Sequence, residues 1–158
     1  VSVTVRSTIS GKPLYKAVTA TDGSSAYNFI LRNIWGKGGF DFTAQDNYFP
    51  ALQDENLQYA IAFSRLMYRV NLSAAAEEHY LDFLHNNAEN AVRYCITQDS
   101  AELLGICKEN GLITAGNVTG LIEFADEQGN TSAAAFLLTV ANSTEHDNFY
   151  NPLSSLEL

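Results

Sequence analysis

The sequence predicts a mainly α-helical protein, α+β overall, in which antiparallel helix pairs follow an N-terminal β-hairpin. From about residue 54 onward, apolar residues recur at helical spacing. Valines alternate with polar residues in the opening stretch, as in a half-buried strand. Small polar and glycine joints divide the helical part into short runs. With 158 residues, the chain corresponds to about one domain with its own core.

Residues 1–21 predict the hairpin. "VSVTVRST" and "YKAVTAT" are the two β-prone runs, and "ISGKPL" between them contains the Gly and Pro that a chain reversal needs. After "TDGS", the stretch "SAYNFILRNIW" is compatible with a short helix that ends at "GKGG".

The stretch "FDFTAQDNYFP", residues 40–50, has no clear period and is expected to form an aromatic-rich loop. Two interpretations stay open: the loop plugs one end of the helical core, or it is an exposed recognition loop. The second interpretation rests on residue types that anchor interfaces, namely Trp35, Phe40, Phe42, Tyr48 and Phe49. We expect residues 1–50 to pack on a helical-repeat body, residues 51–144, and residues 145–158 to form a tail.

The body opens with two predicted helices. "ENLQYAIAFSRLMYR" is apolar nearly all round, with Gln58 and Arg65 on a narrow polar stripe, so most of its sides should be buried. "SAAAEEHYLDFLHNN" begins with Ser73, a residue suited to cap a helix. The core face of this second helix is expected to comprise Ala76, Tyr80, Phe83 and Leu84.

Two helix pairs follow. "ENAVRYCIT" and "SAELLGICKENG" form the first pair, which stops at Gly111. "GNVTGLIEFADEQG", which stops at Gly129, and "NTSAAAFLLTVAN" form the second. When the second pair is aligned with the first at an offset of 31 residues, Gln98 corresponds to Gly129. The first helix of each pair aligns only after a one-residue gap is introduced. Two short helices repeated with a period in the low thirties are typical of an α-solenoid.

The pattern "LLGICKENGLITAGNVTGLIEFADEQGNTSAAAFLL" resembles the ankyrin repeat over about residues 88–142, and more loosely over 54–87. The same stretch, with the preceding "YLDFLHNNAENAVRYCITQDSAELL" and the acidic, aromatic tail, is similar to the C-terminal helical region of uncharacterised proteins of gut Clostridia and their mobile elements. The resemblance implies ankyrin-like helix pairs and a bacterial or phage origin. It implies no activity.

Charge is distributed unevenly along the chain. Residues 1–40 contain five basic residues and one acidic residue, a net charge of +4, whereas residues 41–158 contain four basic and 17 acidic residues, a net charge of −13. Because so acidic a body repels phosphates, direct binding to nucleic acid is not expected. The acidic body is suited instead to a protein partner with a basic surface.

The cysteines and apolar runs indicate a cytoplasmic protein. Cys95 and Cys107 lie among apolar neighbours at helical spacing, which predicts buried free thiols in a reducing compartment. The longest apolar run, residues 133–138, is far shorter than the roughly 20 residues that cross a bilayer.

The sequence predicts no catalytic residue, metal site or cofactor. Glu78, Asp82 and His85 share one arc of a helical wheel, but that arc lies opposite the apolar face, so we interpret these residues as solvated charges. Neither cysteine lies in a glycine-rich elbow, and "GKGG" lacks the spacing of a phosphate-binding loop.

Two functions are compatible with this pattern. The first is a non-enzymatic protein-protein interaction module, the usual role of helical repeats, with the five aromatic residues above as contacts. The alternative is an acidic inhibitor or nucleic-acid mimic from a phage or mobile element that blocks a basic groove of a host or defence protein. The acidic candidates for contact with the partner are Glu77, Glu78, Asp82, Glu123, Asp126 and Glu127.

Overall fold

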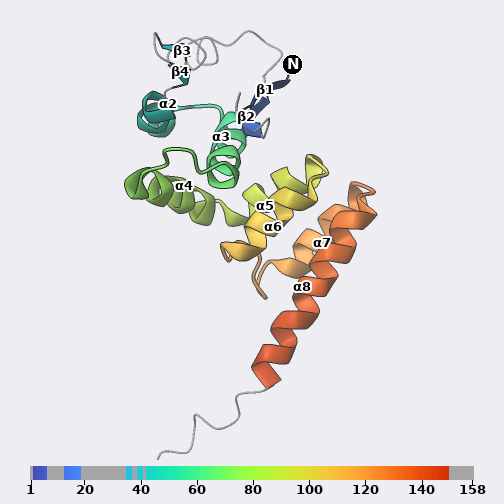
Figure 1. Cartoon of the computed structure of the whole chain (residues 1–158). Helices are drawn as coiled ribbons and strands as arrows, with labels where there is room; N and C mark the ends of the chain where they lie inside the picture. Colours follow the sequence, from blue (N-terminus) through green and yellow to red (C-terminus); the bar gives the residue numbers. More distant parts are fainter. Residues whose placement is uncertain (1, 7–12, 19–34, 37–38, 41, 150–158) are drawn as a thin grey trace, which may run out of the picture. The chain divides into compact units, whose positions relative to one another are not determined.

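The computed structural model describes residues 2–6, 13–18, 35–36, 39–40 and 42–149, which are mainly helical, as the sequence predicts (Figure 1). The chain divides into two compact units, Val1–Asn86 and Asn87–Leu158. The helices on both sides of residue 50, where a boundary was expected, belong to the first unit.

Two short antiparallel strand pairs lie in the first unit. Strand β1 (Ser2–Arg6) pairs with β2 (Pro13–Val18). Strand β3 (Trp35–Gly36) pairs with β4 (Gly39–Phe40). The turn expected within residues 7–12 lies outside the described residues, so the complete hairpin stays a prediction.

The helix expected in "SAYNFILRNIW" lies almost wholly outside the described residues as well. Trp35, its last residue, belongs to strand β3 and lies opposite Phe40. The first and last residues of the "GKGG" segment, which was expected to end the helix, therefore belong to this strand pair.

The expected aromatic loop is instead helical. Helix α2 (Phe42–Tyr48) leads directly into a 3₁₀ turn, η1 (Phe49–Ala51). Four residues at positions i, i+3, i+4 and i+7 are buried: Phe42, Gln45, Asp46 and Phe49. This spacing defines one face of a helix. A hydrophobicity pattern misses it because two of the four buried residues are polar.

Helices α3 (Glu55–Met67) and α4 (Ala74–Asn86) complete the described part of the first unit, and they pack against each other. The Asp54 side chain accepts a hydrogen bond from the Leu57 amide at 3.0 Å and thereby caps α3. The predicted cap at Ser73 is confirmed, since its hydroxyl oxygen accepts from the Ala76 amide at 3.2 Å. Of the core face predicted for α4, three residues are buried and Phe83 is half-buried.

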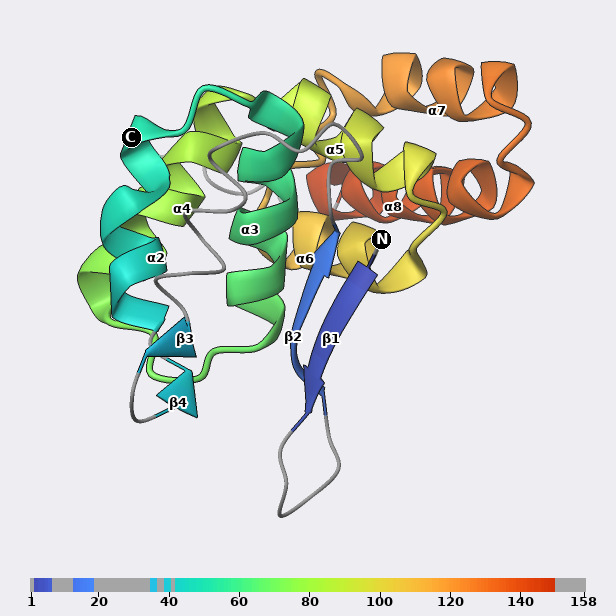
Figure 2. The same cartoon turned by 90° about the horizontal axis from the view of Figure 1, so that it is seen from above.

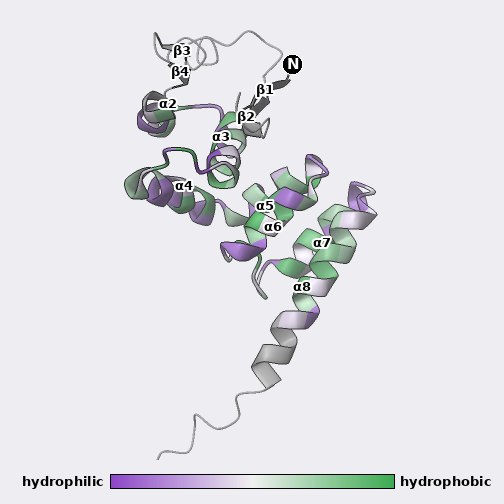
Figure 3. Cartoon of the chain, in the orientation of Figure 1, coloured by the Kyte–Doolittle hydropathy of each residue, from purple (hydrophilic) through white to green (hydrophobic). Residues whose placement is uncertain are grey.

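The described part of the second unit consists of two helix hairpins. Helices α5 (Ala88–Thr97) and α6 (Ala101–Glu109) form the first, and α7 (Val118–Glu127) and α8 (Thr131–Phe149) form the second. Helix α5 packs beside α7 and α6 packs beside α8, so that corresponding helices are neighbours (Figure 2). Hydrophilic residues gather at the two hairpin turns (Figure 3).

The structure corrects the repeat offset from 31 to 30 residues. The turn residues Gln98 and Gln128 have almost identical backbone angles, φ −80° and ψ −5° against φ −78° and ψ −6°. They are followed by Asp99 (φ +50°) and Gly129 (φ +68°), each in the left-handed region. An offset of 30 also superimposes the starts of α5 and α7, at residues 88 and 118, so no gap is needed.

Helix caps explain why the offset was wrong by one residue. Both Asn130 and Thr131 are residue types that can cap a helix, and an offset of 31 residues makes Thr131 the counterpart of Ser100. In the structure Ser100 accepts from the Leu103 amide at 3.4 Å, and Asn130 accepts from the Ala133 amide at 3.0 Å. Ser100 and Asn130 are therefore the equivalent caps.

Glycine ends α6 and α7, as the sequence predicts. After α7, the Gly129 amide donates to the Asp126 carbonyl at 2.9 Å and the Asn130 amide donates to the Ala125 carbonyl at 2.9 Å. This pair of bonds is the Schellman motif, which requires a left-handed residue. Gly111, also at φ +68°, ends α6 through the same arrangement.

Asn130 joins the two hairpins. In addition to capping α8, its side-chain amide donates to the Ile96 carbonyl near the end of α5 at 2.9 Å. We expect Asn130→Ala to lower the free energy of unfolding by about 1–2 kcal/mol, because it removes a cap and an interhelical hydrogen bond. Urea unfolding followed by circular dichroism measures this loss.

Two further variants serve as controls. Asn130→Ser retains a capping oxygen without placing a charge against the Ile96 carbonyl, and should lose less stability than the alanine variant. Asn142→Ala changes an exposed residue of α8 and should alter stability by under about 0.5 kcal/mol. Equal effects at positions 130 and 142 would contradict the joining role of Asn130.

Candidate protein-interaction surfaces

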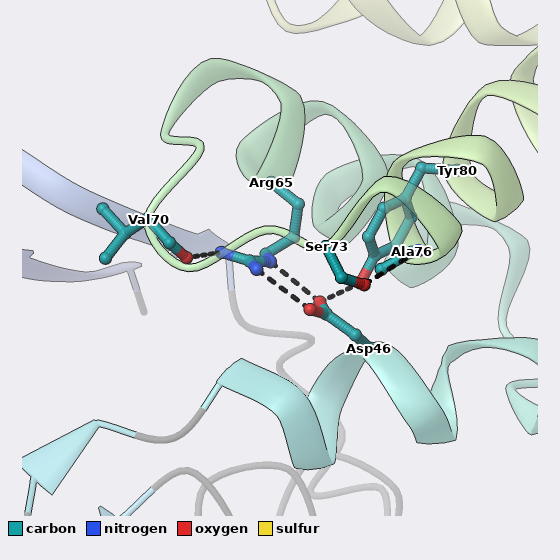
Figure 4. Close-up of polar contacts among 6 residues, drawn as sticks. All are labelled: Asp46, Arg65, Val70, Ser73, Ala76 and Tyr80. Carbon is teal, nitrogen blue, oxygen red and sulfur yellow. Dashed lines mark hydrogen bonds and ion pairs between the residues drawn. The ribbon is translucent and has the colours of Figure 1, made fainter.

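A buried cluster of polar side chains, Asp46, Arg65 and Tyr80, lies in the described part of the first unit. Arg65 of α3 donates from Nε and Nη2 to the two carboxylate oxygens of Asp46 on α2, at 2.8 and 2.9 Å (Figure 4). The Tyr80 hydroxyl of α4 donates to the same carboxylate at 2.6 Å. Each of the three helices therefore contributes one member.

The surroundings of Arg65 complete its coordination. Its Nη1 donates to the Val70 carbonyl at 3.0 Å, and its guanidinium lies 4.2 Å from the centre of the Phe42 ring. Arg65 has no exposed surface. It therefore lies in the core, which corrects its expected place on a polar stripe. A side chain with this many donors can occupy the interior only because each side of it meets a partner.

This cluster is structural rather than reactive. Burial, followed by the hydrogen bond to Asp46, raises the pKa of Tyr80 well above its ordinary value of 10. Tyr80 therefore stays protonated and keeps donating to the carboxylate throughout the physiological pH range. A small hollow of ≈ 190 Å³ beside Asp46 is also lined by Asn47, Asn71 and His79.

The structure corrects two of the aromatic contact residues. Phe42 and Phe49 are each only 3% exposed, so they belong to the core and present no surface to a partner. The Phe49 ring makes edge contacts with Tyr80 and Phe83, with centroids 4.5 and 5.3 Å apart. Tyr48 is half-buried. The side chains of Trp35 and Phe40 lie outside the described part of the structure, so their role stays a prediction.

The acidic candidates lie in two different units. On α4, Glu78 and Asp82 are exposed, whereas Glu77 is half-buried and forms an ion pair with Arg69 at 2.7 Å. On α7, Glu123, Asp126 and Glu127 are all exposed. The α7 residues occupy positions i, i+3 and i+4 and therefore form a single stripe, which we call the α7 acidic stripe.

The arginine that lies against α7 is already paired with an acid of its own helix. Arg93 of α5 pairs with Glu89 at 2.7 Å, and its guanidinium lies 4.6 Å from the centre of the Phe124 ring. Residues 87–143 contain seven acidic and two basic residues, a net charge of −5. The described part of the second unit therefore has an acidic surface.

An open polar hollow of ≈ 360 Å³ lies between the two hairpin turns. We call it the turn hollow. Its lining comprises Ile96, Thr97, Asp99, Gln128, Gly129, Asn130, Thr131 and Ser132. Hydroxyl, amide and carboxylate groups can exchange hydrogen bonds with a polar or cationic group of a partner.

Within residues 42–143, the side chains assemble no recognisable catalytic set. No group of three or more His, Cys, Asp or Glu residues among those described could hold a metal ion. Cys95 and Cys107 are free and fully buried, as the sequence predicts. No helix among the described residues has both the length and the apolar character needed to cross a membrane.

The buried pair yields a stability prediction. Asp46→Asn should lower the free energy of unfolding by about 3–5 kcal/mol, because it leaves the Arg65 charge buried without a counterion. Urea unfolding provides the measurement. Glu89→Gln breaks the exposed pair with Arg93 and should cost less than about 1 kcal/mol. If both variants lost equally little, Arg65 would have to reach water, which would contradict its buried position.

Comparison with known proteins identifies no relative. No protein-family model matches the chain, and neither a curated protein nor a solved structure shows significant similarity to it. The function is therefore inferred from the geometry and charge of the surfaces described above.

Proposed function

We propose that this chain is a non-enzymatic protein-protein interaction module whose second unit carries the contact surface. One observation supports this proposal above the others. Two helix hairpins stack at an offset of 30 residues, with corresponding helices as neighbours and a hydrogen bond between their turns. Such stacking aligns equivalent side chains along one surface, which is how helical repeats present a binding face.

The proposal includes a relation to ankyrin-like repeats. Two features support it: each hairpin has a first helix of ten residues, and a tight left-handed turn leads into the second helix. The segment between the hairpins, residues 110–117, is short. Asn117 fastens this segment by donating to the Leu112 carbonyl and accepting from the Thr114 amide, both at 2.8 Å.

We place the contact on the α7 acidic stripe and the neighbouring turn hollow. Gln128 and Gly129, which follow α7 directly, belong to the lining of the hollow, so the two features are continuous in sequence. A protein segment rich in Lys or Arg complements this surface in charge. Such complementarity accelerates association and fixes the orientation of the partner.

A second candidate function is the acidic inhibitor or nucleic-acid mimic from a phage or mobile element. The observation in its favour is the use of the basic residues. Among residues 42–143, three of the four basic side chains, Arg65, Arg69 and Arg93, form ion pairs with acidic neighbours. Acidic residues therefore dominate the surface of this part. A basic groove that binds nucleic-acid phosphates would attract such a surface.

The interaction proposal predicts that charge on α7 is needed for binding. A partner is first captured with the wild-type chain, identified by mass spectrometry and purified. The triple variant Glu123→Gln, Asp126→Asn, Glu127→Gln should then bind it about 10- to 100-fold more weakly, because three favourable charge contacts are lost. Isothermal titration calorimetry measures both affinities.

A double variant in the other unit, Glu78→Gln with Asp82→Asn, is the matched control. It changes exposed acids of α4 and should retain the wild-type affinity. Circular dichroism confirms that both variants keep their helices. Equal affinity of the triple variant and the wild type would remove α7 from the contact surface.

The mimic proposal predicts a steep salt dependence and competition. Against a purified nucleic-acid-handling partner, raising the salt from about 0.05 to 0.3 M should weaken binding at least tenfold, because ions screen exposed charges. The chain should also displace a labelled DNA or RNA duplex, as measured by fluorescence anisotropy. Binding that ignores salt, or that leaves the duplex in place, would count against mimicry.

A further inference from the structure

Two cysteines face each other inside the first helix hairpin of the second unit. Cys95 of α5 and Cys107 of α6 have their Sγ atoms 3.5 Å apart. Neither residue has exposed surface, and both are free thiols. The interaction surface proposed above makes no use of them.

We propose that Cys95 and Cys107 form a reversible intramolecular disulfide that ties α5 to α6, so that the stability of this hairpin responds to the redox state. The sulfur atoms must approach by roughly 1.5 Å to reach the S–S bond length of about 2.05 Å. The two residues lie on adjacent helices joined by a short turn. The bond therefore links neighbouring helices of one hairpin and closes a loop of few residues.

The repeat separates this role from ordinary packing. At the offset of 30 residues, Cys95 corresponds to Ala125 and Cys107 corresponds to Leu137, and all four residues are buried. Carbon side chains fill both equivalent positions in the second hairpin. Packing at these positions therefore does not require sulfur, and only the first hairpin has a pair that can be cross-linked.

The reaction is a thiol-disulfide exchange with a low-molecular-weight disulfide such as oxidised glutathione. One cysteine thiolate attacks a sulfur of the oxidant, which forms a mixed disulfide and releases one glutathione thiolate. The other cysteine then attacks the protein sulfur of that mixed disulfide and releases the second glutathione. The two protein thiols lose two electrons and two protons, and the oxidant gains both.

Burial determines when this exchange occurs. It raises the pKa of the Cys95 thiol, so the folded hairpin contains little of the reactive thiolate. Since no surface of either thiol is exposed, the oxidant reaches them only when the hairpin opens. A glutathione adduct has no room in the closed core, which favours attack by the neighbouring cysteine. The completed disulfide is then protected as the thiols were.

The test uses the full chain equilibrated with oxidised glutathione in urea just below its unfolding midpoint, and then transferred out of urea. Trypsin releases residues 94–108, which contain both cysteines, as one peptide. We expect this peptide to be lighter by two hydrogen atoms. After further cleavage at Glu102 its two halves should stay together until dithiothreitol is added. The urea midpoint of the oxidised chain should exceed that of the reduced chain by about 1 M.

Cys95→Ala and Cys107→Ala are the controls. Neither should form a cross-linked peptide or gain stability after oxidation, because a lone cysteine can form only a mixed disulfide with glutathione, which the closed core has no room for. Comparison of the oxidised and reduced wild type does not depend on how well these variants fold. Three results would overturn the proposal: stable glutathione adducts on the wild type, thiols that stay free after equilibration, or an oxidised chain no more stable than the reduced one.

Discussion

The packing of helices α2, α3 and α4 in the first unit depends on the hydrogen bonds that the Asp46 carboxylate accepts. This carboxylate lies on α2 and accepts hydrogen bonds from Arg65 of α3 and Tyr80 of α4, so one side chain fixes three helices. A buried carboxylate or guanidinium without a partner costs several kcal/mol, and any arrangement that separates these groups is therefore disfavoured. This requirement also accounts for α2 itself, because only a helical turn places Phe42, Asp46 and Phe49 on one buried face.

The second unit meets the same requirement with backbone groups in place of charges. At each hairpin turn the last carbonyls of one helix and the first amides of the next need partners. Asn130 supplies both kinds, since its oxygen caps α8 while its nitrogen donates to the Ile96 carbonyl of α5. The apolar stacking of the helices is nonspecific in register, whereas a hydrogen bond between turns is not. The bond therefore helps to set which turn lies beside which.

The sequence predicts those parts of the fold that depend on local signals. Helical spacing locates α3 to α8, and Ser73, Gly111 and Gly129 act as the predicted cap and stops because each acts on its own helix. Predictions fail where distant residues decide. Gln45 and Asp46 have the polarity of loop residues, so the sequence predicts a loop. They are buried in a helix because Arg65, 19 positions away from Asp46, neutralises its carboxylate. Two of the five aromatic contact residues fail for the same reason, since burial of Phe42 and Phe49 follows from the packing of three helices. The acidic residues of α7 are exposed, as their place opposite an apolar face implies.

Charge connects this architecture to the proposed function. Arginines take part in the packing of the described units, since the buried Arg65 holds α2 and the half-buried Arg93 lies against Phe124 of α7. Each of these arginines is also paired with an acid, so neither adds net positive charge to its surroundings. The field at the surface is therefore set by the remaining acids. Between residues 87 and 143 the excess of five negative charges belongs to one compact unit. The proposal therefore assigns every acidic residue of the partner contact to this one unit.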